Sequence, residues 1–445
     1  MTDDDSLAFQ LPLAFSPYSY PLFCLFYLTL VAFFRGRRLR STLVKHPYST
    51  RASFASMTNE DAYLIQKGIG ELEFPFTFEK SLQFALFRTY GIPTISKLLV
   101  QTNQLSEGST ATKRYTDTTV LIAEFLGYHP TSARSIEAIG RMNYIHSQYQ
   151  ESGKILDDDL LYTLSLFAGE PARWIDEYEW RKLEDFERCA IGAFWKAIGD
   201  AMGIGYEKLR GGEEGGQGWI DGLQWLDELK EWSAEYEKRF MLPDKNNQKT
   251  AEQTVAILLY SMPRFVKPYG IRIVSALMDD RLRTAMMYVH FFPRGIQPLH
   301  ILSDGHSPRY EKPSQEYLIL VSTLFTVRKF VLRYLMFPRP HFLRVHNTTD
   351  EPSQAGTYHM TVYETHPWYV KPTVLKRFEP RAWKNWIMGL PVPGDEGDKY
   401  RPNGYKIPEI GPDFMRGKGA DFMRASKERL VGERMKGCPF GRLKE

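Results

Sequence analysis

Apolar residues recur every three or four positions along most of the chain, and this spacing predicts amphipathic helices. The predicted helices begin at polar residues that can cap them and end at glycine or proline. Alternation of period two, which would indicate strands, is scarce, and no internal repeat is visible. The sequence therefore predicts a mostly α protein, with helices over 59–75, 78–105 (two pieces, broken at Gly91 and Pro93), 113–127, 130–150, 156–170, 177–204 and most of 219–336.

The N-terminal region departs from this pattern because it is apolar at nearly every position. No charged residue occurs between Ser6 and Phe34, and the densest part, 18–34, is near the lower limit of roughly 17–25 residues for crossing a bilayer. Three aspartates precede it and four arginines follow it, whereas a cleaved signal peptide would carry basic residues first and small residues at its end. We expect an uncleaved single-pass anchor, with the arginines and the main domain in the cytosol.

The domain organisation follows from this anchor and from a change of composition near Pro338. Beyond that proline, Trp, Tyr, Arg and Lys are mixed with further prolines, which suits either a bilayer interface or an irregular cap on the domain. The predicted parts are a short extracytosolic N-terminus (1–17), a transmembrane anchor (18–34), a linker (35–58), a large helical domain (59–336) and a C-terminal aromatic and basic extension packed on that domain (337–445).

Composition narrows the possible partners. The 28 Phe, 25 Tyr and 9 Trp suit a large apolar cavity or close contact with a membrane. A net charge of only +4 gives no reason to expect nucleic acid as a partner. The three cysteines are far apart, so they predict neither a disulfide framework nor a zinc site, and a reducing compartment is expected.

One histidine is placed where a helix would bury it. Ile136, Ile139, Met142, His146 and Tyr149 share one helical stripe, at offsets of three or four residues. An imidazole that faces the protein interior needs a hydrogen-bonding partner or a metal. From this stretch alone, a hydrogen-bonded core histidine is the plainer interpretation.

Three kinds of oxygen-activating iron site have ligand patterns that can be recognised in a sequence. A di-iron site in a helix bundle uses Glu-x-x-His pairs, and none of the ten histidines has an acid three positions before it. A facial triad often contains His-x-Asp/Glu, which is also missing. Cys438 lies too near the C-terminus for a cysteine-ligated haem. A histidine-ligated haem requires only one inward imidazole, and His146 meets that requirement.

Several acidic groups invite functional interpretations that simpler structural roles explain. The three aspartates at 157–159 begin a predicted helix, where carboxylates stabilise the positive end of the helix dipole. Glu184 and Glu187 are expected on the solvated face of the helix predicted over 177–204.

Long blocks of the sequence resemble the fungal endoplasmic-reticulum (ER)-bound oxygenase family MpaB of mycophenolic acid biosynthesis. They include KRYTDTTVLIAEFL, the stretch from RMNYIHSQYQ to AIGDAMGI, YLIQKGIGELEFPF, MDDRLRTAM, VRKFVLRYL and KGCPF. More distantly, Arg114-x-x-x-Thr118 followed by His146 is similar to the latex-clearing protein family, haem b dioxygenases with a globin-like helical core. The resemblance therefore implies a globin-like haem-binding core in the helical domain.

The resemblance also implies roles for single residues. His146 corresponds to the proximal ligand of the haem iron, and Arg114 and Thr118 correspond to catalytic residues on the opposite side of the haem. The latex-clearing enzymes have a lysine that caps the iron directly before the threonine, where this sequence has Asp117. No acid near 96–100 matches their proposed catalytic base.

The function implied is cleavage of a C=C bond by a membrane-bound oxygenase. The expected cofactor is haem b, the co-substrate is molecular oxygen, and the substrate is a hydrophobic small molecule with a prenyl side chain of the farnesyl type. The expected location is the ER membrane, from which such a substrate can enter directly. Two alternatives stay open: an oxygenase of the same fold that hydroxylates or oxidises another polyketide or terpenoid, and a membrane-tethered binding protein without catalysis.

Overall fold

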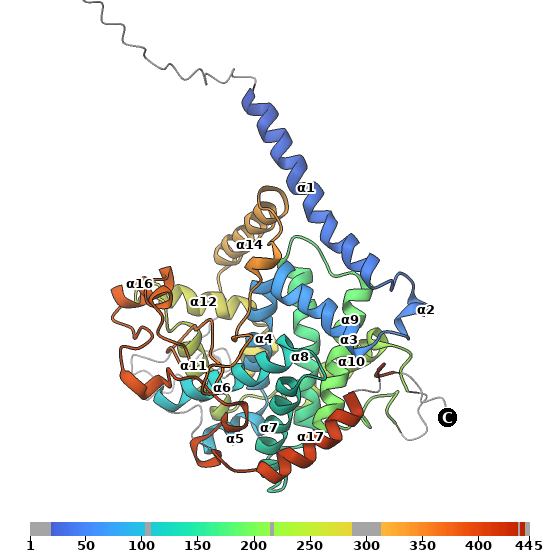
Figure 1. Ribbon diagram of the computed structural model, residues 1–445, viewed down its shortest axis with the longest axis vertical. Helices are drawn as coiled ribbons and strands as arrows, with labels where there is room; N and C mark the ends of the chain where they lie inside the picture. The colour runs from blue at the N-terminus through green and yellow to red at the C-terminus, as the bar shows by residue number, and fades with distance from the viewer. Residues whose placement is uncertain (1–18, 103–107, 214–217, 287–312, 435–436, 441–445) are drawn as a thin grey trace, which may run out of the picture.

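The computed structural model describes residues 19–102, 108–213, 218–286, 313–434 and 437–440. The described residues are mostly helical, which confirms the predicted fold class, and they contain no β-strand beyond three isolated bridges (Figure 1). The helices are α1 (Ser19–Lys45), α2 (Arg51–Phe54), α3 (Asn59–Lys67), η1 (Gly68–Glu73), α4 (Pro75–Thr89), α5 (Pro93–Gln101), α6 (Gly108–Gly127), α7 (Ala133–Gln150), α8 (Asp157–Tyr178), α9 (Asp185–Met202), α10 (Gly222–Phe240), α11 (Lys245–Leu258), α12 (Lys267–Leu277), α13 (Asp280–Ala285), α14 (Gln315–Phe330), η3 (Val331–Leu335), η4 (His341–Leu343), α15 (Val374–Arg377), α16 (Pro380–Ile387), η5 (Gly397–Tyr400), η6 (Ile407–Glu409), η7 (Asp413–Met415) and α17 (Ala420–Arg434).

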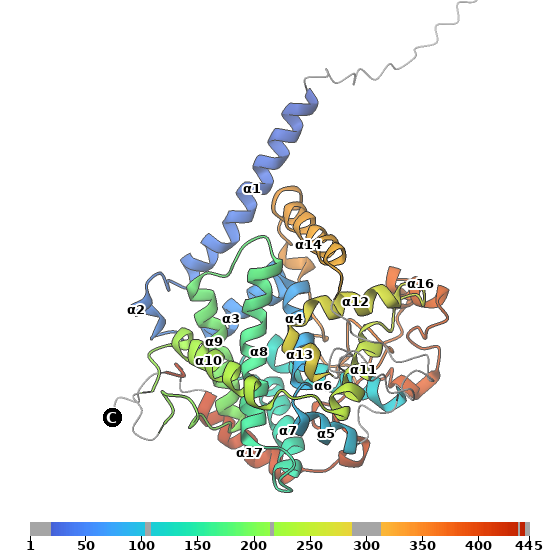
Figure 2. The same cartoon turned by 180° about the vertical axis from the view of Figure 1, so that it is seen from behind.

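Helix α8 lies at the centre of the core, between α4, α9 and α10 (Figures 1 and 2). Its first turn carries the three aspartates, as the sequence predicted for a helix start. The predicted end before Pro171 is wrong, because α8 continues for seven residues beyond that proline to Tyr178. Leu161, Leu166 and Ile175 are buried against neighbouring helices, and this packing outweighs the hydrogen bond that a proline cannot donate.

The single helix predicted over 177–204 is in fact divided between α8 and α9. Glu184 forms the N-cap of α9, and its backbone N–H donates to the carboxylate of Glu187 at 2.9 Å. Glu187 is also paired with Arg181 at 2.7 Å and is only 3% exposed. The expectation that Glu187 is solvated is therefore wrong, since this carboxylate closes the start of a buried helix.

Helices α6 and α7 pack against each other and join the C-terminal residues to the core. Arg134 on α7 donates two hydrogen bonds, of 2.7 and 2.6 Å, to Glu124 on α6, which also accepts one from Tyr405. A second hydrophobic cluster forms between the two helices and the segment from Met360 to Met415. The C-terminal residues therefore fix how α6 and α7 are positioned.

The described part of the predicted anchor belongs to helix α1, and 1–18 lie outside the described residues. Among the residues that the structure does describe, no helix is long and apolar enough to cross a membrane. Within the described residues, helix α1 runs uncharged from Ser19 to Phe34 and then continues through four arginines to Lys45. The prediction of a single-pass anchor at 18–34 is therefore not supported.

We predict that Arg141→Met destabilises the protein strongly. Arg141 on α7 is fully buried and donates to the carbonyl oxygens of Ile410, Lys418 and Met415 at 2.6, 2.9 and 3.0 Å. Loss of the guanidinium leaves buried acceptors without donors, which should lower the free energy of unfolding by about 3 kcal/mol or more.

The measurement is urea unfolding in detergent, with Arg210→Met as the control. Arg210 forms an exposed ion pair with Glu231, worth about 0–1 kcal/mol. Equal losses in the two variants would contradict the structural role of Arg141.

Candidate functional site

An internal cavity of about 230 Å³ lies between α4, α5, α6, α7, α8, α9 and α11. Most of its lining is apolar, contributed by Leu86, Ile95, Leu98, Leu99, Leu121, Ile122, Phe125, Met142, Ile145, Leu160, Leu164, Phe167, Trp195, Ile198, Met202, Ile204 and Ile257. Such a lining excludes water and suits a hydrophobic ligand.

His146 lines this cavity from α7. The helix begins after Ser132, whose hydroxyl accepts a hydrogen bond from the Ser135 N–H at 3.2 Å. The five residues of the predicted stripe occupy two environments. Ile136 and Ile139 are buried in the core, whereas Met142, His146 and Tyr149 line the cavity. The sequence therefore predicted the inward placement of His146 correctly.

The His146 imidazole is neutral at physiological pH. Burial, followed by the positive charge of Arg114, lowers its pKa to about 4. Among the described residues, none forms a hydrogen bond or an ion pair with this imidazole. The plainer interpretation, a hydrogen-bonded core histidine, therefore finds no support there, and a nitrogen lone pair stays available to a ligand.

Arg114 and Thr118 line the same cavity from α6, one helical turn apart. The Arg114 guanidinium donates to the Thr118 hydroxyl oxygen at 2.6 Å, and that hydroxyl donates to the Arg114 carbonyl at 3.0 Å. No carboxylate of the described residues forms an ion pair with Arg114. Its charge is therefore held beside the cavity by a hydroxyl rather than by an acid.

Asp117 lies on a neighbouring face of α6 and does not line this cavity. Its carboxylate pairs with Lys113 at 2.7 Å and accepts a hydrogen bond from the Tyr369 hydroxyl at 2.7 Å. Burial raises the pKa of Asp117, and Lys113 opposes that shift. Asp117 thus connects α6 to the C-terminal residues.

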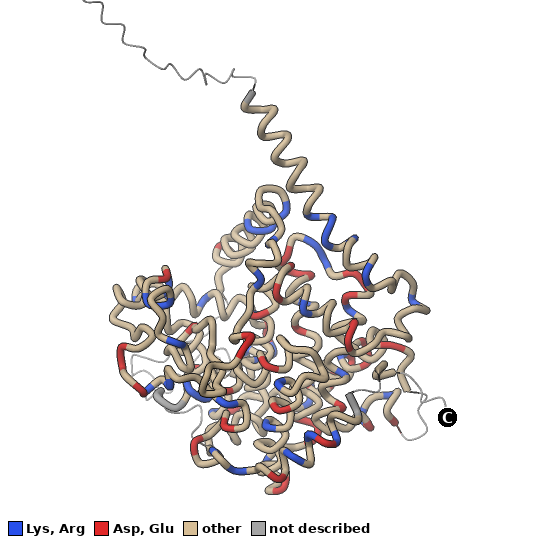
Figure 3. The backbone as a smooth tube through the Cα atoms, viewed as in Figure 1, with Lys and Arg blue, Asp and Glu red and all other residues tan. Residues whose placement is uncertain are grey.

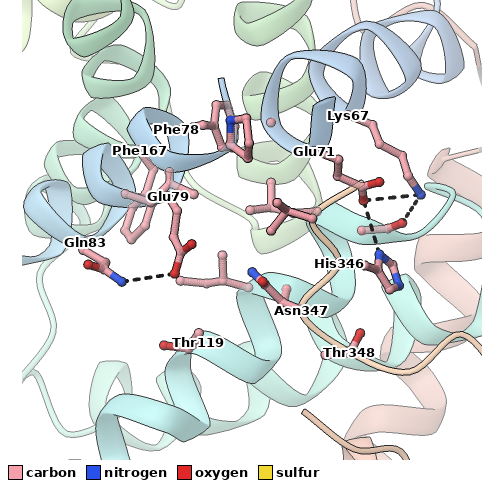
Figure 4. A pocket seen from close by; sticks show the side chains of 18 of the residues that line it. Lys67, Glu71, Phe78, Glu79, Gln83, Thr119, Phe167, His346, Asn347 and Thr348 are labelled. Atoms are coloured by element: carbon pink, nitrogen blue, oxygen red, sulfur yellow. Dashed lines mark hydrogen bonds and ion pairs between the residues drawn. The ribbon is translucent and has the colours of Figure 1, made fainter. Parts of the chain in front are cut away.

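Figure 4 shows a second, smaller cavity of about 120 Å³. It adjoins the first, since Leu86, Tyr115, Thr118, Ile122 and Phe167 line both. Glu79 on α4 lines it, close to Gln83, whose amide donates to the Glu79 carboxylate at 3.4 Å. Burial, followed by the negative charge of Glu364, raises the pKa of Glu79 to about 7.

With a pKa of about 7, Glu79 can give or take a proton near neutral pH at the wall of the smaller cavity. Sequence analysis missed it because its local sequence, FTFEKSLQF, is that of an ordinary amphipathic helix. The charge that shifts its pKa comes from Glu364, 285 positions away in the sequence.

The described residues form neither a site for a bare metal ion nor a reactive buried thiol. Across the described ranges, no group of three or more His, Cys, Asp or Glu side chains is arranged to hold a bare metal ion. The three cysteines are free thiols, and burial raises the pKa of Cys189 to about 12, so that thiol is unreactive.

The residues around the larger cavity fit a haem with a histidine ligand. Such a ligand must be a neutral imidazole with a free nitrogen, and His146 has both properties. The surrounding side chains are mainly aliphatic and aromatic, as the faces of a porphyrin require. His146 would hold the iron from α7, and Arg114 and Thr118 would lie beside the haem on α6.

The fold and cavity together define an α-helical protein whose mainly apolar internal site presents the neutral imidazole of His146 beside the guanidinium of Arg114. The chain is 46% identical over 418 residues to ER-bound oxygenase mpaB' of Penicillium brevicompactum, covering 94% of this chain and 93% of that one. It is 43% identical over 382 residues to ER-bound oxygenase mpaB of the same species (86% and 85%), and 52% identical over 263 residues to the mpaB of Penicillium roqueforti (59% and 87%). No family model matches the chain.

The chain therefore belongs to the MpaB family of fungal ER-bound oxygenases, as its sequence blocks predicted. The more distant relationship to the latex-clearing proteins is not addressed by these comparisons and stays a prediction.

We predict that Glu79→Gln stabilises the protein relative to wild type as the pH rises from 5 to 8. The folded-state pKa of Glu79 is raised, so the native state holds a proton that the unfolded state releases above its ordinary pKa. Wild type is therefore penalised as the pH rises towards 7, and glutamine escapes this penalty, which is on the order of 2 kcal/mol.

The test compares urea unfolding of both proteins at pH 5 and pH 8. Glu231→Gln, at an exposed position, is the control and should track wild type. A stability difference between Glu79→Gln and wild type that does not change with pH would contradict the raised pKa.

Proposed function

We propose that the protein is a haem-dependent oxygenase of the ER membrane that cleaves a C=C bond in a prenyl side chain of the farnesyl type. The observation that carries the proposal is the neutral, unpaired imidazole of His146, close to the charge of Arg114 on one apolar cavity. The names of the Penicillium relatives support an oxygenase bound to the ER.

Haem b, when bound, would supply the chemistry that activates molecular oxygen. His146 would hold the iron, and burial would keep this ligand unprotonated well below neutral pH. The reaction is balanced without another reductant, because one C=C bond and one O₂ molecule give two carbonyl groups.

Arg114 would stabilise the negative charge that develops on oxygen during the reaction. A fixed cation acts strongly in a cavity that excludes water, since it need not reorganise as charge appears. Thr118 would orient the guanidinium through its 2.6 Å hydrogen bond. The apolar lining would bind the isoprenoid chain by contact with its methyl groups.

Glu79 would serve the same reaction as a proton reservoir. It lines the smaller cavity, which shares Thr118 with the larger one, and its pKa of about 7 allows it to give or take a proton.

The domain is proposed to face the cytosol, so protease added to sealed microsomes would digest it.

We predict that His146→Ala abolishes both haem binding and activity. Alanine provides no ligand for the iron, so the Soret absorption of the purified protein and its cleavage of a farnesylated aromatic should be lost together. Added imidazole should restore part of the Soret band by occupying the space left by the side chain.

The control is His129→Ala, at a side chain that lines neither cavity, hydrogen-bonds to Thr131 at 2.8 Å and lies 3.5 Å from the Glu60 carboxylate. It should keep full haem content and activity. Equal haem loading of wild type and His146→Ala would refute the ligand assignment, and wild type without haem after supplementation would favour a binding protein.

We predict that Arg114→Lys reduces turnover on the order of 100-fold while haem content and folding are kept. Lysine retains the charge but cannot reproduce the planar guanidinium that donates to Thr118. Thr118→Val should cost less, about tenfold, because the guanidinium stays but loses the oxygen that orients it.

Oxygen uptake with a farnesylated aromatic measures both effects, and Arg210→Lys at the surface is the control. Arg114→Lys with turnover within about threefold of wild type would reduce Arg114 to a structural residue.

A further inference from the structure

Helix α14 carries a long uncharged stretch and is only partly covered in the described structure, at Tyr317, Val321, Phe325, Arg328 and Lys329. No residue of Gln315–Phe330 is buried, and no charge occurs between Tyr317 and Val327. A helix that is apolar all round is normally buried in a protein core or in lipid. The exposed large side chains are Leu318, Ile319, Leu320, Leu324, Val327 and Phe330.

This helix is fixed to the domain at its C-terminal end. Arg328 donates to the Tyr178 carbonyl at 3.1 Å and to the Glu179 carboxylate at 2.7 Å, and the rings of Phe325 and Tyr178 lie 4.6 Å apart. Lys329 donates to the Glu177 carbonyl. Since Arg328 and Lys329 are directed to the end of α8, the exposed side chains between Leu318 and Val327 form a surface without charge.

The apolar half of α1 approaches the same region (Figures 1 and 2). The Tyr27 hydroxyl donates to the Leu335 carbonyl at 2.6 Å, and Arg35 donates to the Met336 carbonyl at 2.8 Å. Phe337 lies 5.3 Å from the ring of Tyr27. The two apolar helices are therefore joined through η3 and protrude from the same side of the domain.

Threonine hydroxyls on both helices donate within their own helix, which is compatible with a lipid environment. The Thr323 and Thr326 hydroxyls donate to the Ile319 and Ser322 carbonyls at 2.8 Å, and Thr29 on α1 donates to the Leu25 carbonyl at 2.7 Å.

The charge pattern and the dimensions agree with a lipid surface. In Figure 3 the outer part of α1 is uncharged and its part nearer the domain is basic, including the exposed Arg37 and Arg40, which would meet anionic headgroups. The uncharged stretch of α14 is about 16 Å long, close to half of the roughly 30 Å apolar layer of a bilayer.

We propose that α14, η3 and the apolar half of α1 form one docking face that enters the facing leaflet of a membrane. The ER-bound character in the names of the relatives does not say which surface binds. In this docking face, α14 and η3 form a second membrane contact, which is far from α1 in the sequence. It orients the domain on the bilayer independently of the reaction that the cavity performs.

The test uses single-cysteine variants of the full chain labelled with bimane. The background carries Cys24→Ser and Cys438→Ser and keeps Cys189, whose side chain is buried. Labels are placed at Leu320→Cys and Leu324→Cys on α14, and at Val431→Cys on α17, which lies at the opposite end of the molecule (Figure 1). The proteins are reconstituted into vesicles of phosphatidylcholine and phosphatidylserine, with or without doxyl-labelled lipid.

Labels on α14 should lose about half of their fluorescence to doxyl lipid and be shielded from aqueous iodide, because they would lie about 5–10 Å into the acyl region. The label at Val431→Cys should show the reverse. Iodide quenching on α14 equal to that on α17 would overturn the proposal, and protection from both quenchers would show that another protein copy covers the face.

Discussion

The arrangement of the site depends on how α6 is oriented, because one of its faces meets the C-terminal residues and another lines the larger cavity. Toward the C-terminal residues, the buried carboxylates of Asp117 and Glu124 are matched by Lys113 and Arg134 and by the hydroxyls of tyrosines from that segment. Breaking one partner of a buried pair leaves an uncompensated charge, so these contacts fix the rotation of the helix about its axis. That rotation turns Arg114 and Thr118 toward the cavity. The C-terminal segment thus controls the site without lining most of it.

The second constraint is electrostatic. His146 and Arg114 are close enough for the cation to lower the imidazole pKa, and burial acts in the same direction. A protonated imidazole beside a guanidinium in an apolar cavity would be strongly unfavourable, so the pair keeps His146 neutral. The same uncompensated cation is attractive to negative charge that appears only during a reaction. The closeness of Arg114 and His146 therefore has two effects: it keeps the imidazole neutral, and it places a positive charge beside the larger cavity.

Glu79, the proposed proton reservoir, lines the smaller cavity and not the larger one. Glu79 and Glu364 are held near each other by Lys80 and Gln83, and the cation and amide favour charge on Glu364. The proton is therefore left on Glu79, at the wall of the smaller cavity. Glu79 does not line the larger cavity, which meets the smaller one at residues that include Tyr115, Thr118 and Phe167.

The sequence by itself determined the features that local periodicity and long matched blocks can carry. The spacing of apolar residues predicted the helices and the inward face of His146, and the matched blocks predicted the family. Local signals failed where tertiary packing outweighed them, as at Pro171, which packing holds inside α8, and at Glu187, which closes the start of α9. The apolar run at the N-terminus predicted a spanning helix, whereas no helix of the described residues is long and apolar enough to cross a membrane. Only the tertiary structure brought Glu364 to Glu79 and Tyr369 to Asp117, because these contacts join positions more than 250 residues apart. No local pattern of residues encodes such a distance, since it is set by how all the helices pack together.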